Sequence, residues 1–197
     1  MSNKNEEFEL RGINHLALVC KDMARTVDFY TNVLGMPLTK TIDLPTMGPG
    51  GGGQHFFFDI GNGDSLAFFW FPQAPAAAPG IASPEKAVGF AETPSEWITA
   101  HGSMNHVAFD VDKEKFDEYY EKLQSKGIEV SPILNHDTSK YQVSREVTPD
   151  VFVRSFYFMD PDGIMLEFAA WTRALRPDEA LVAPKTAADA QQATPVS

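Results

Sequence analysis

The sequence predicts an α+β protein built from two β-α-β-β-β modules, and three observations lead to that prediction. Short apolar strands alternate with single helical stripes in both halves of the chain. The dipeptide Asn14-His15 at the first strand recurs as Asn105-His106, and Gly63 before the last strand of the first half recurs as Gly163. Since one module alone would leave its sheet poorly enclosed, we expect the two modules to pair side by side.

These patterns divide the chain into five segments. They are a polar lead-in at 1–10, the first module at 11–72, a connection at 73–102, the second module at 103–172 and a flexible tail at 173–197. The connection is rich in proline and alanine and has little periodicity, which is typical of a long loop that covers another part of the protein. The tail is rich in alanine, proline and glutamine, so we expect it to be loosely ordered.

In the first module, the pattern predicts one helix between strands. A strand at 13–19 is followed by Asp22 as a helix N-cap and by Gly35 as the residue that ends the helix. The helical stripe consists of Val27, Tyr30 and Leu34. Three further strands are expected, at 38–44, 55–60 and 65–71.

The second module repeats this order. A strand at 104–111 is followed by Asp112 as an N-cap, a helical stripe and Gly127 as the helix end. The stripe consists of Phe116, Tyr120 and Leu123. We expect strands at 128–133, 152–159 and 164–170, with a polar loop at 135–148.

Composition excludes several classes of function. The chain has 197 residues with 16 basic and 27 acidic side chains, and its net charge of −11 argues against binding to nucleic acid or to an anionic membrane surface. Cys20 is the single cysteine, which excludes an internal disulfide and a cysteine-rich zinc site. The chain has no apolar run of about 20 residues and no apolar signal region at its start, so we expect a cytoplasmic protein.

Three residues of metal-ligating type lie on apolar strands. His15 and His106 occupy the same position in the two modules, and Glu167 lies within an apolar strand. A single histidine in such a place is usually a core residue, but its repetition favours a ligand. A carboxylate buried there needs a cation or a hydrogen-bond donor. Two imidazoles and one carboxylate form a facial triad that leaves positions open on a divalent metal.

Four motifs give the chain a resemblance to a known family. They are Gly12-Ile-Asn-His15-Leu-Ala-Leu-Val, Phe29-Tyr-Thr-Asn-Val-Leu-Gly-Met36, Met104-Asn-His106-Val-Ala-Phe and Asp160-Pro-Asp-Gly-Ile-Met-Leu-Glu167-Phe. In this order they resemble the paired βαβββ modules of the vicinal oxygen chelate superfamily, which includes glyoxalases, bleomycin resistance proteins and extradiol dioxygenases. The resemblance implies a cupped mixed sheet around a metal held by His15, His106 and Glu167.

Within that superfamily the chain most resembles the type I extradiol ring-cleavage dioxygenases. Ala67 stands where a glyoxalase-type site would have a further carboxylate, and alanine cannot coordinate a metal. His136 and Tyr157 match the histidine and tyrosine that flank the bound catechol in the extradiol enzymes. The resemblance therefore implies Fe(II), or next Mn(II), a catechol-like or vicinal-diol aromatic substrate, and O2.

The first module departs from the extradiol pattern at one position. Those enzymes carry an acid–base histidine just before the last strand of this module, where this chain has Gly63-Asp64-Ser65. We expect Asp64, His55 or His136 to take over that role, or the ring-cleaving step to be absent.

Two further hypotheses remain open on the same scaffold. One is a non-redox isomerase, epimerase or lyase that uses Zn, Ni or Co, and the other is a non-catalytic binding protein whose histidines serve packing. A phosphonate substrate is less favoured, because few basic residues lie near the triad; Arg145 and Arg154 are the exceptions, and a surface position is the default for both.

The surroundings of the site are also open to interpretation. Candidate pocket-lining aromatics are Phe56, Phe58, Phe68 and Trp70, but core packing is the interpretation we favour for them, because aromatic residues in strands mostly pack in the core. The glycine run from Gly48 to Gly53 and the proline-rich connection are candidate lids, and slack in the chain is the alternative. By resemblance, we expect a homodimer.

Overall fold

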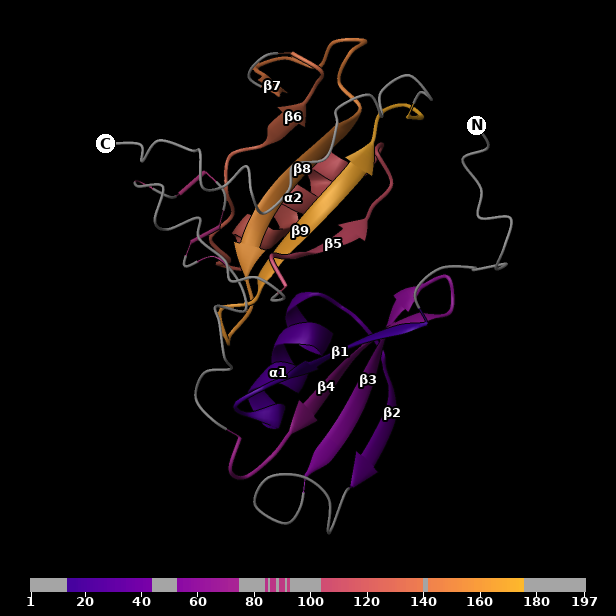
Figure 1. The fold of residues 1–197 in the computed structure, drawn as a ribbon, viewed down its shortest axis with the longest axis vertical. Coiled ribbons are helices and arrows are strands. Elements are labelled where there is room, and N and C mark those ends of the chain that lie inside the picture. Colours follow the sequence, from indigo (N-terminus) through magenta and orange to yellow (C-terminus); the bar gives the residue numbers. More distant parts are fainter. Residues whose placement is uncertain are drawn as a thin grey trace, which may run out of the picture.

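The computed structural model describes residues 14–43, 53–74, 84, 86–87, 89–90, 92, 104–139 and 142–175. Within these ranges the chain forms two modules, each with a mixed β-sheet that carries one α-helix near it (Figure 1). The α+β class and the repeated module are therefore confirmed. No helix among the described residues is long and apolar enough to cross a membrane.

The first module follows the predicted order of elements. These are β1 (His15–Val19), α1 (Met23–Asp28), a π-helical turn η1 (Phe29–Val33), β2 (Leu38–Asp43), β3 (Gln54–Gly61) and β4 (Asp64–Trp70). The sheet order is β1-β4-β3-β2, with β1 parallel to β4 and the other pairs antiparallel. The Asp22 carboxylate accepts a hydrogen bond from the backbone N–H of Arg25 at 3.0 Å, as an N-cap does, and Gly35 ends the helix with φ +74°.

The second module repeats this layout with one additional short strand. It contains β5 (Val107–Asp110), α2 (Phe116–Ser125), β6 (Leu134–His136), β7 (Val143–Ser144), β8 (Val153–Met159) and β9 (Met165–Trp171). The sheet order is β5-β9-β8-β6-β7, and β5 is parallel to β9 just as β1 is parallel to β4.

Two local predictions for the second module are wrong. The helix does not begin after Asp112, because this residue closes a turn instead, accepting from the N–H of Glu114 on its side chain and from that of Lys115 on its carbonyl. The strand expected at 128–133 is absent, since Pro132 has no N–H to donate to a strand ladder. Strand β6 starts after it, inside the range expected to be a polar loop.

Strand hydrogen bonds among the described residues stay within each module, so the two sheets are separate and do not form one continuous sheet. A shared apolar core joins the modules instead, with Tyr30 and Phe58 from the first and Phe116 and Phe158 from the second. In the view of Figure 1, the edge strands β1 and β5 lie on the sides of their sheets that face the other module. Side-by-side pairing is therefore achieved through the core and not through a strand ladder.

Polar contacts connect the two modules at the turn between β8 and β9. The Tyr30 hydroxyl donates to the Asp160 carboxylate at 3.2 Å, and the backbone N–H of Lys21 donates to Asp162 at 3.2 Å. At the other helix, the Lys126 ammonium donates to the carbonyls of Asn32 and Val33. These contacts tie the end of each helix to the opposite module.

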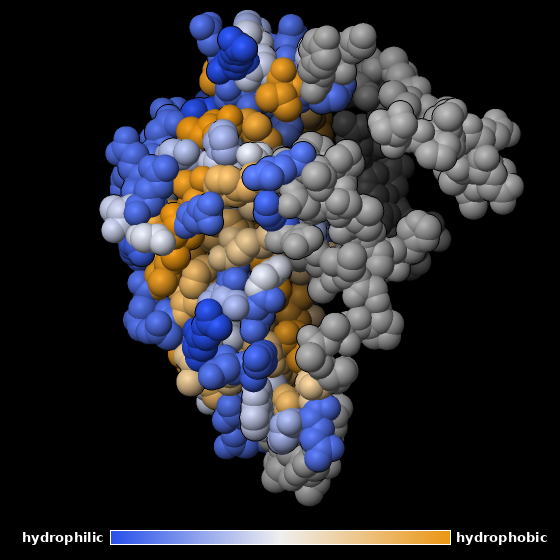
Figure 2. Space-filling model, turned by 90° about the vertical axis from the view of Figure 1, so that its left-hand side faces the viewer, coloured by the Kyte–Doolittle hydropathy of each residue, from blue (hydrophilic) through white to orange (hydrophobic). Residues whose placement is uncertain are grey.

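Apolar side chains also remain at the surface. The most exposed large ones are Val19, Leu38, Val143, Val147, Trp171 and Leu175. Figure 2 shows apolar areas interspersed with hydrophilic residues down one side of the molecule. Residues 1–10, the glycine run at 48–52, most of the connection and the tail beyond 175 lie outside the described residues, so the lid and tail hypotheses stay predictions.

The Tyr30–Asp160 contact leads to a prediction of pH-dependent stability. Burial raises the pKa of Asp160, while the Tyr30 hydroxyl opposes that rise because it donates to the charged form. The free energy of unfolding therefore falls as the pH rises through the folded-state pKa of Asp160 and this carboxyl ionises. The hydrogen bond from Tyr30 makes that fall smaller. We expect Tyr30→Phe to lower the free energy of unfolding by about 1–3 kcal/mol at pH 7 and by less at pH 4, measured by urea denaturation.

Tyr119→Phe, which removes the hydroxyl of a half-buried tyrosine on α2, is the control. Equal losses for Tyr30→Phe at both pH values would contradict the assignment.

Candidate metal-binding site

Polar residues gather on one face of the second sheet because side chains alternate along each strand. His136 lies on β6, Ser155 and Tyr157 lie on β8, Glu167 lies on β9, and His106 directly precedes β5. Tyr157 pairs with Glu167 in the antiparallel register. The intervening residues of β8 and β9 point to the other face and pack in the core; they include Phe156, Phe158, Leu166 and Phe168.

His106 and Glu167 meet on this face, as the sequence predicted. The Nε2 atom of His106 lies 2.9 Å from Oε2 of Glu167, and the Glu167 side chain is only 7% exposed. Two ligands that each lie about 2.1 Å from an ion, at right angles to one another, are about 3.0 Å apart. The separation of this nitrogen and oxygen therefore fits two neighbouring ligands of one cation.

A neighbouring amide orients each of the two repeated histidines. Nδ1 of His106 lies 2.7 Å from Oδ1 of Asn105, and Nδ1 of His15 lies 2.8 Å from Oδ1 of Asn14. An amide oxygen only accepts, so Nδ1 carries the proton and Nε2 keeps the lone pair with which a neutral histidine binds a metal. We had not assigned a role to either asparagine, although the repeated Asn-His dipeptide was the signal for it.

His15 does not join the His106–Glu167 pair in the structure. The described residues contain no group of three or more His, Cys, Asp or Glu side chains that could hold a metal ion. The His15 ring instead makes an edge contact with Phe57, at 5.6 Å between ring centroids. With the proton of a neutral His106 on Nδ1, its Nε2 atom and the ionised Glu167 carboxylate are both acceptors, so a proton or a cation between them is needed to make their contact favourable. His106 and Glu167 therefore lie as two ligands of one metal ion would, whereas His15 does not lie beside them in this structure.

Tyr157 and His136 lie on the same face as the pair and are connected through Ser155. Nε2 of His136 lies 2.8 Å from the Ser155 hydroxyl, which lies 3.4 Å from the Tyr157 hydroxyl. Burial raises the pKa of Tyr157 to about 12, and the charge of Glu167 adds to this rise. The Tyr157 ring also makes an edge contact with the ring of His106, at 5.7 Å.

Part of the connection between the modules covers this face. Ala87 and Phe90 pack with Tyr157 and Met165 in a small apolar cluster. Gly89 has φ +95°, and a Cβ there would lie 2.9 Å from the Pro132 ring, so only glycine fits this close approach. The connection therefore covers another part of the protein, as expected, and the part covered is the surroundings of Tyr157.

The other two candidate catalytic residues, Asp64 and His55, lie on the first sheet and do not join the pair. Asp64 begins β4 and shares the strand face of Leu66 and Phe68, the face opposite to that of His15. His55 is buried, with its ring stacked on Phe69 at 3.6 Å.

The four aromatic residues considered as a pocket lining belong to the core, which was the interpretation favoured from the sequence. Phe56, Phe58, Phe68 and Trp70 all pack in the main apolar cluster. Strand alternation brings the adjacent Phe57 and Phe69 to the face of His15, where Phe57 contacts both His15 and His55. Both faces of these strands are aromatic, so the sequence gives no apolar–polar alternation that distinguishes the face of His15 from the core face.

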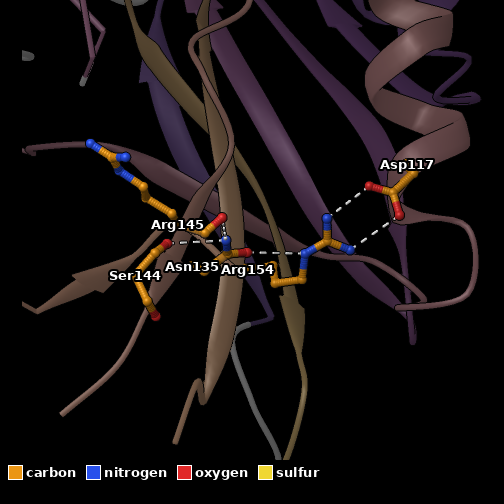
Figure 3. Close-up of polar contacts among 5 residues, drawn as sticks. All are labelled: Asp117, Asn135, Ser144, Arg145 and Arg154. Atoms are coloured by element: carbon orange, nitrogen blue, oxygen red, sulfur yellow. Dashed lines mark hydrogen bonds and ion pairs between the residues drawn. The ribbon is translucent and has the colours of Figure 1, made fainter. Parts of the chain in front are cut away.

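Arg154 is committed to a structural role on the helix side of the second sheet. Its guanidinium forms a two-pronged ion pair with Asp117 of α2, at 2.8 and 3.1 Å, and its Nε donates to Asn135 at 3.3 Å (Figure 3). Asn135 in turn donates to the backbone carbonyls of Ser144 and Arg145. Arg154 therefore braces β8 against α2, and it lies on the face opposite to Glu167.

Comparison with known proteins assigns the family. The chain belongs to the Glyoxalase/Bleomycin resistance protein/Dioxygenase superfamily, whose model matches residues 12–168. This is the vicinal oxygen chelate superfamily, whose members bind divalent metals, act on small substrates and often dimerise.

Three solved structures share the fold. SMU.1112c has a TM-score of 0.54 and 23% identity, with 81% of this chain and 98% of that chain covered. A glyoxalase family protein from Enterococcus faecalis has a TM-score of 0.54 and 22% identity, with 82% and 99% covered. A glyoxalase/dioxygenase from Nostoc punctiforme has a TM-score of 0.53 and 22% identity, with 88% and 99% covered. At these identities, the likeness shows the fold alone.

The burial of His136 leads to a second prediction on stability. Burial lowers the pKa of His136 below its usual 6.5, although the charge of Glu167, the Gln142 carbonyl and Asp137 oppose that shift. A neutral His136 therefore contributes stability that is present above the unfolded-state pKa and is lost as the pH falls through the folded-state value. We expect the wild type to lose more stability than His136→Gln between pH 7.5 and pH 5, measured by urea denaturation.

Thr26→Val, which replaces a buried residue that does not titrate, is the control and keeps the wild-type pH dependence. An unchanged pH dependence in His136→Gln would contradict the prediction.

Proposed function

We propose that the chain is a metal-dependent enzyme that binds a small substrate through two neighbouring oxygen atoms, and specifically an extradiol-type dioxygenase for a catechol-like or vicinal-diol aromatic substrate. The contact between His106 and the buried Glu167 carboxylate is the observation that supports this proposal. The two side chains meet at the separation of neighbouring metal ligands, on the same face as Tyr157 and His136.

In this proposal His106, Glu167 and His15 hold the metal, with Fe(II) first and Mn(II) next as its identity. His15 is supported as the third ligand by its hydrogen bond to Asn14, which prepares its Nε2 atom as Asn105 prepares that of His106. Two neutral imidazoles and one carboxylate leave a divalent ion with a net charge of +1. That charge suits a substrate which binds as an anionic oxygen.

The bound ion would lower the pKa of the substrate hydroxyls and hold O2 beside the ring. The Tyr157 hydroxyl stays protonated at neutral pH and is a hydrogen-bond donor to a substrate oxygen. His136 is mostly neutral at pH 7, since burial lowers its pKa, and is therefore a proton acceptor on this face. Ala87 and Phe90 exclude water from the ring of Tyr157.

The proposed reaction needs no added reductant. The ring C–C bond beside the two hydroxylated carbons breaks, and both atoms of O2 enter the product, one in a carbonyl group and one in a carboxylate. The substrate supplies the electrons that reduce O2.

A non-redox isomerase, epimerase or lyase that uses Zn, Ni or Co is the alternative. The position of Asp64 favours it, because this carboxylate lies on the face opposite to His15 and does not replace the acid–base histidine of the extradiol enzymes. We also propose a homodimer, supported by exposed apolar side chains such as Val19 and Trp171.

Metal binding tests the ligand set. We expect His106→Ala and Glu167→Gln to weaken Mn(II) or Fe(II) binding by at least about 100-fold, and His15→Ala by at least about 10-fold, because each removes one ligand. Elemental analysis of anaerobically purified protein and calorimetric titration with Mn(II) measure this.

His55→Ala, which removes a histidine outside the ligand set, should keep the metal. Stoichiometric metal in all three ligand variants would refute the site, and metal retained by His15→Ala alone would exclude His15.

Oxygen uptake tests the reaction. We expect the Fe(II)-loaded protein to consume O2 with at least one of catechol, 3-methylcatechol and 2,3-dihydroxybiphenyl, and to form a coloured ring-cleavage product. Glu167→Gln should abolish uptake, because it removes the charged ligand. An oxygen electrode and visible absorbance measure both.

A metal-loaded protein that consumes no O2 with this panel would favour the non-redox alternative. A wild type that binds no metal would favour a binding protein.

A further inference from the structure

A row of polar side chains crosses the second sheet from β6 to β5, in the order His136, Ser155, Tyr157, Glu167 and His106. Ser155 lies in the middle of this row and is completely buried. Its hydroxyl lies 2.8 Å from His136 and 3.4 Å from Tyr157. Tyr157 pairs with Glu167 in the strand register, and Glu167 contacts His106 at 2.9 Å. Ser155 is therefore the only residue of the row for which we have given no function.

We propose that Ser155 joins Tyr157 to His136 as a proton relay, so that a proton released by a bound substrate hydroxyl is held on His136. In this transfer the substrate hydroxyl gives its proton to the Tyr157 oxygen, Tyr157 gives its own to Ser155, and Ser155 gives its own to Nε2 of His136. Tyr157 thereby keeps one proton, and with it donates to the substrate oxygen once that oxygen is ionised. Each O–H bond that breaks is matched by one O–H or N–H bond that forms, and His136 becomes an imidazolium. The role in catalysis rests on the proposed function, whereas the hydrogen-bonded link does not.

The surroundings of His136 suit a proton acceptor that is partly shielded from water. The ring is half-buried, with Phe152 at 6.5 Å between ring centroids. The Glu167 and Asp137 carboxylates and the Gln142 carbonyl favour its charged form, and burial opposes it. Among the residues that the structure describes, the Ser155 hydroxyl is the atom that contacts both Nε2 of His136 and the Tyr157 hydroxyl.

Nuclear magnetic resonance of the metal-free full chain tests the link itself. With 15N-labelled histidine and 13Cζ-labelled tyrosine, we expect Ser155→Ala to shift both the His136 ring nitrogens and the Tyr157 signal. In the wild-type background, Tyr157→Phe should shift the signals of the His136 ring nitrogens. In the Ser155→Ala background it should leave these signals unchanged, because the Ser155 hydroxyl that transmits the effect is gone. Thr26→Val, which removes a buried hydroxyl that donates to Asp22, should shift neither.

A His136 signal that ignores Tyr157→Phe in the wild type would overturn the link. Equal shifts in Thr26→Val would also overturn it, because they would show that any buried hydroxyl has this effect.

Proton release on binding of 4-nitrocatechol to the Mn(II)-loaded protein tests the relay. Calorimetry in two buffers with different ionisation enthalpies gives the number of protons released at pH 7. We expect both Ser155→Ala and His136→Gln to release more protons than the wild type, by up to about one, because the proton that His136 holds then goes to the buffer. The affinity for Mn(II) should change by less than about 3-fold in both variants.

Proton release equal to that of the wild type in both variants would overturn the relay, and so would a loss of Mn(II) affinity in Ser155→Ala as large as that in Glu167→Gln. A wild type that binds neither Mn(II) nor 4-nitrocatechol would instead overturn the proposed function, and the resonance experiment would still decide the link.

Discussion

The burial of the Glu167 carboxylate is the constraint on which the second module depends. An ionised carboxylate on an apolar sheet is costly unless donors or a cation face it. In the structure the His106 ring lies 2.9 Å from this carboxylate, and the Asn105 amide orients that ring. In the proposed metal site, a cation held between the two side chains would offset the cost of burying the carboxylate.

The alternation of side chains separates structural from chemical roles on each strand. On β8, Arg154 points to the helix side and braces the sheet through Asp117, whereas the adjacent Ser155 points to the site. Phe156 packs in the core, and Tyr157 again faces the site. A shift of one residue in the register would exchange these two sets, so the ion pair of Arg154 and the apolar core help to keep the site residues on their face.

The two modules contribute unequally, although their sequences repeat. The second module brings together two of the proposed ligands and the hydroxyls of Ser155 and Tyr157, and the described part of the connection covers the surroundings of Tyr157. The first module offers His15 with an amide partner, beside Phe57. The modules are held through the turn at Asp160, whose carboxylate accepts from Tyr30 of the first module and from the backbone N–H groups of Asp162 and Ile164. This turn directly precedes β9, so the contact between the modules is coupled to the strand that carries Glu167.

The sequence by itself determined the α+β class, the repeated module, the first helix with its cap at Asp22, and the meeting of His106 with Glu167. These features follow from local signals: strand and helix periods, capping residues and a dipeptide that recurs at the same strand. Only the tertiary structure decided that Asp64 faces away from His15 and that Ser155 links His136 to Tyr157. The physical reason is that both facts depend on the register between strands distant in sequence, and a residue's own neighbours do not specify which hydroxyl or carboxylate a partner strand will bring opposite to it.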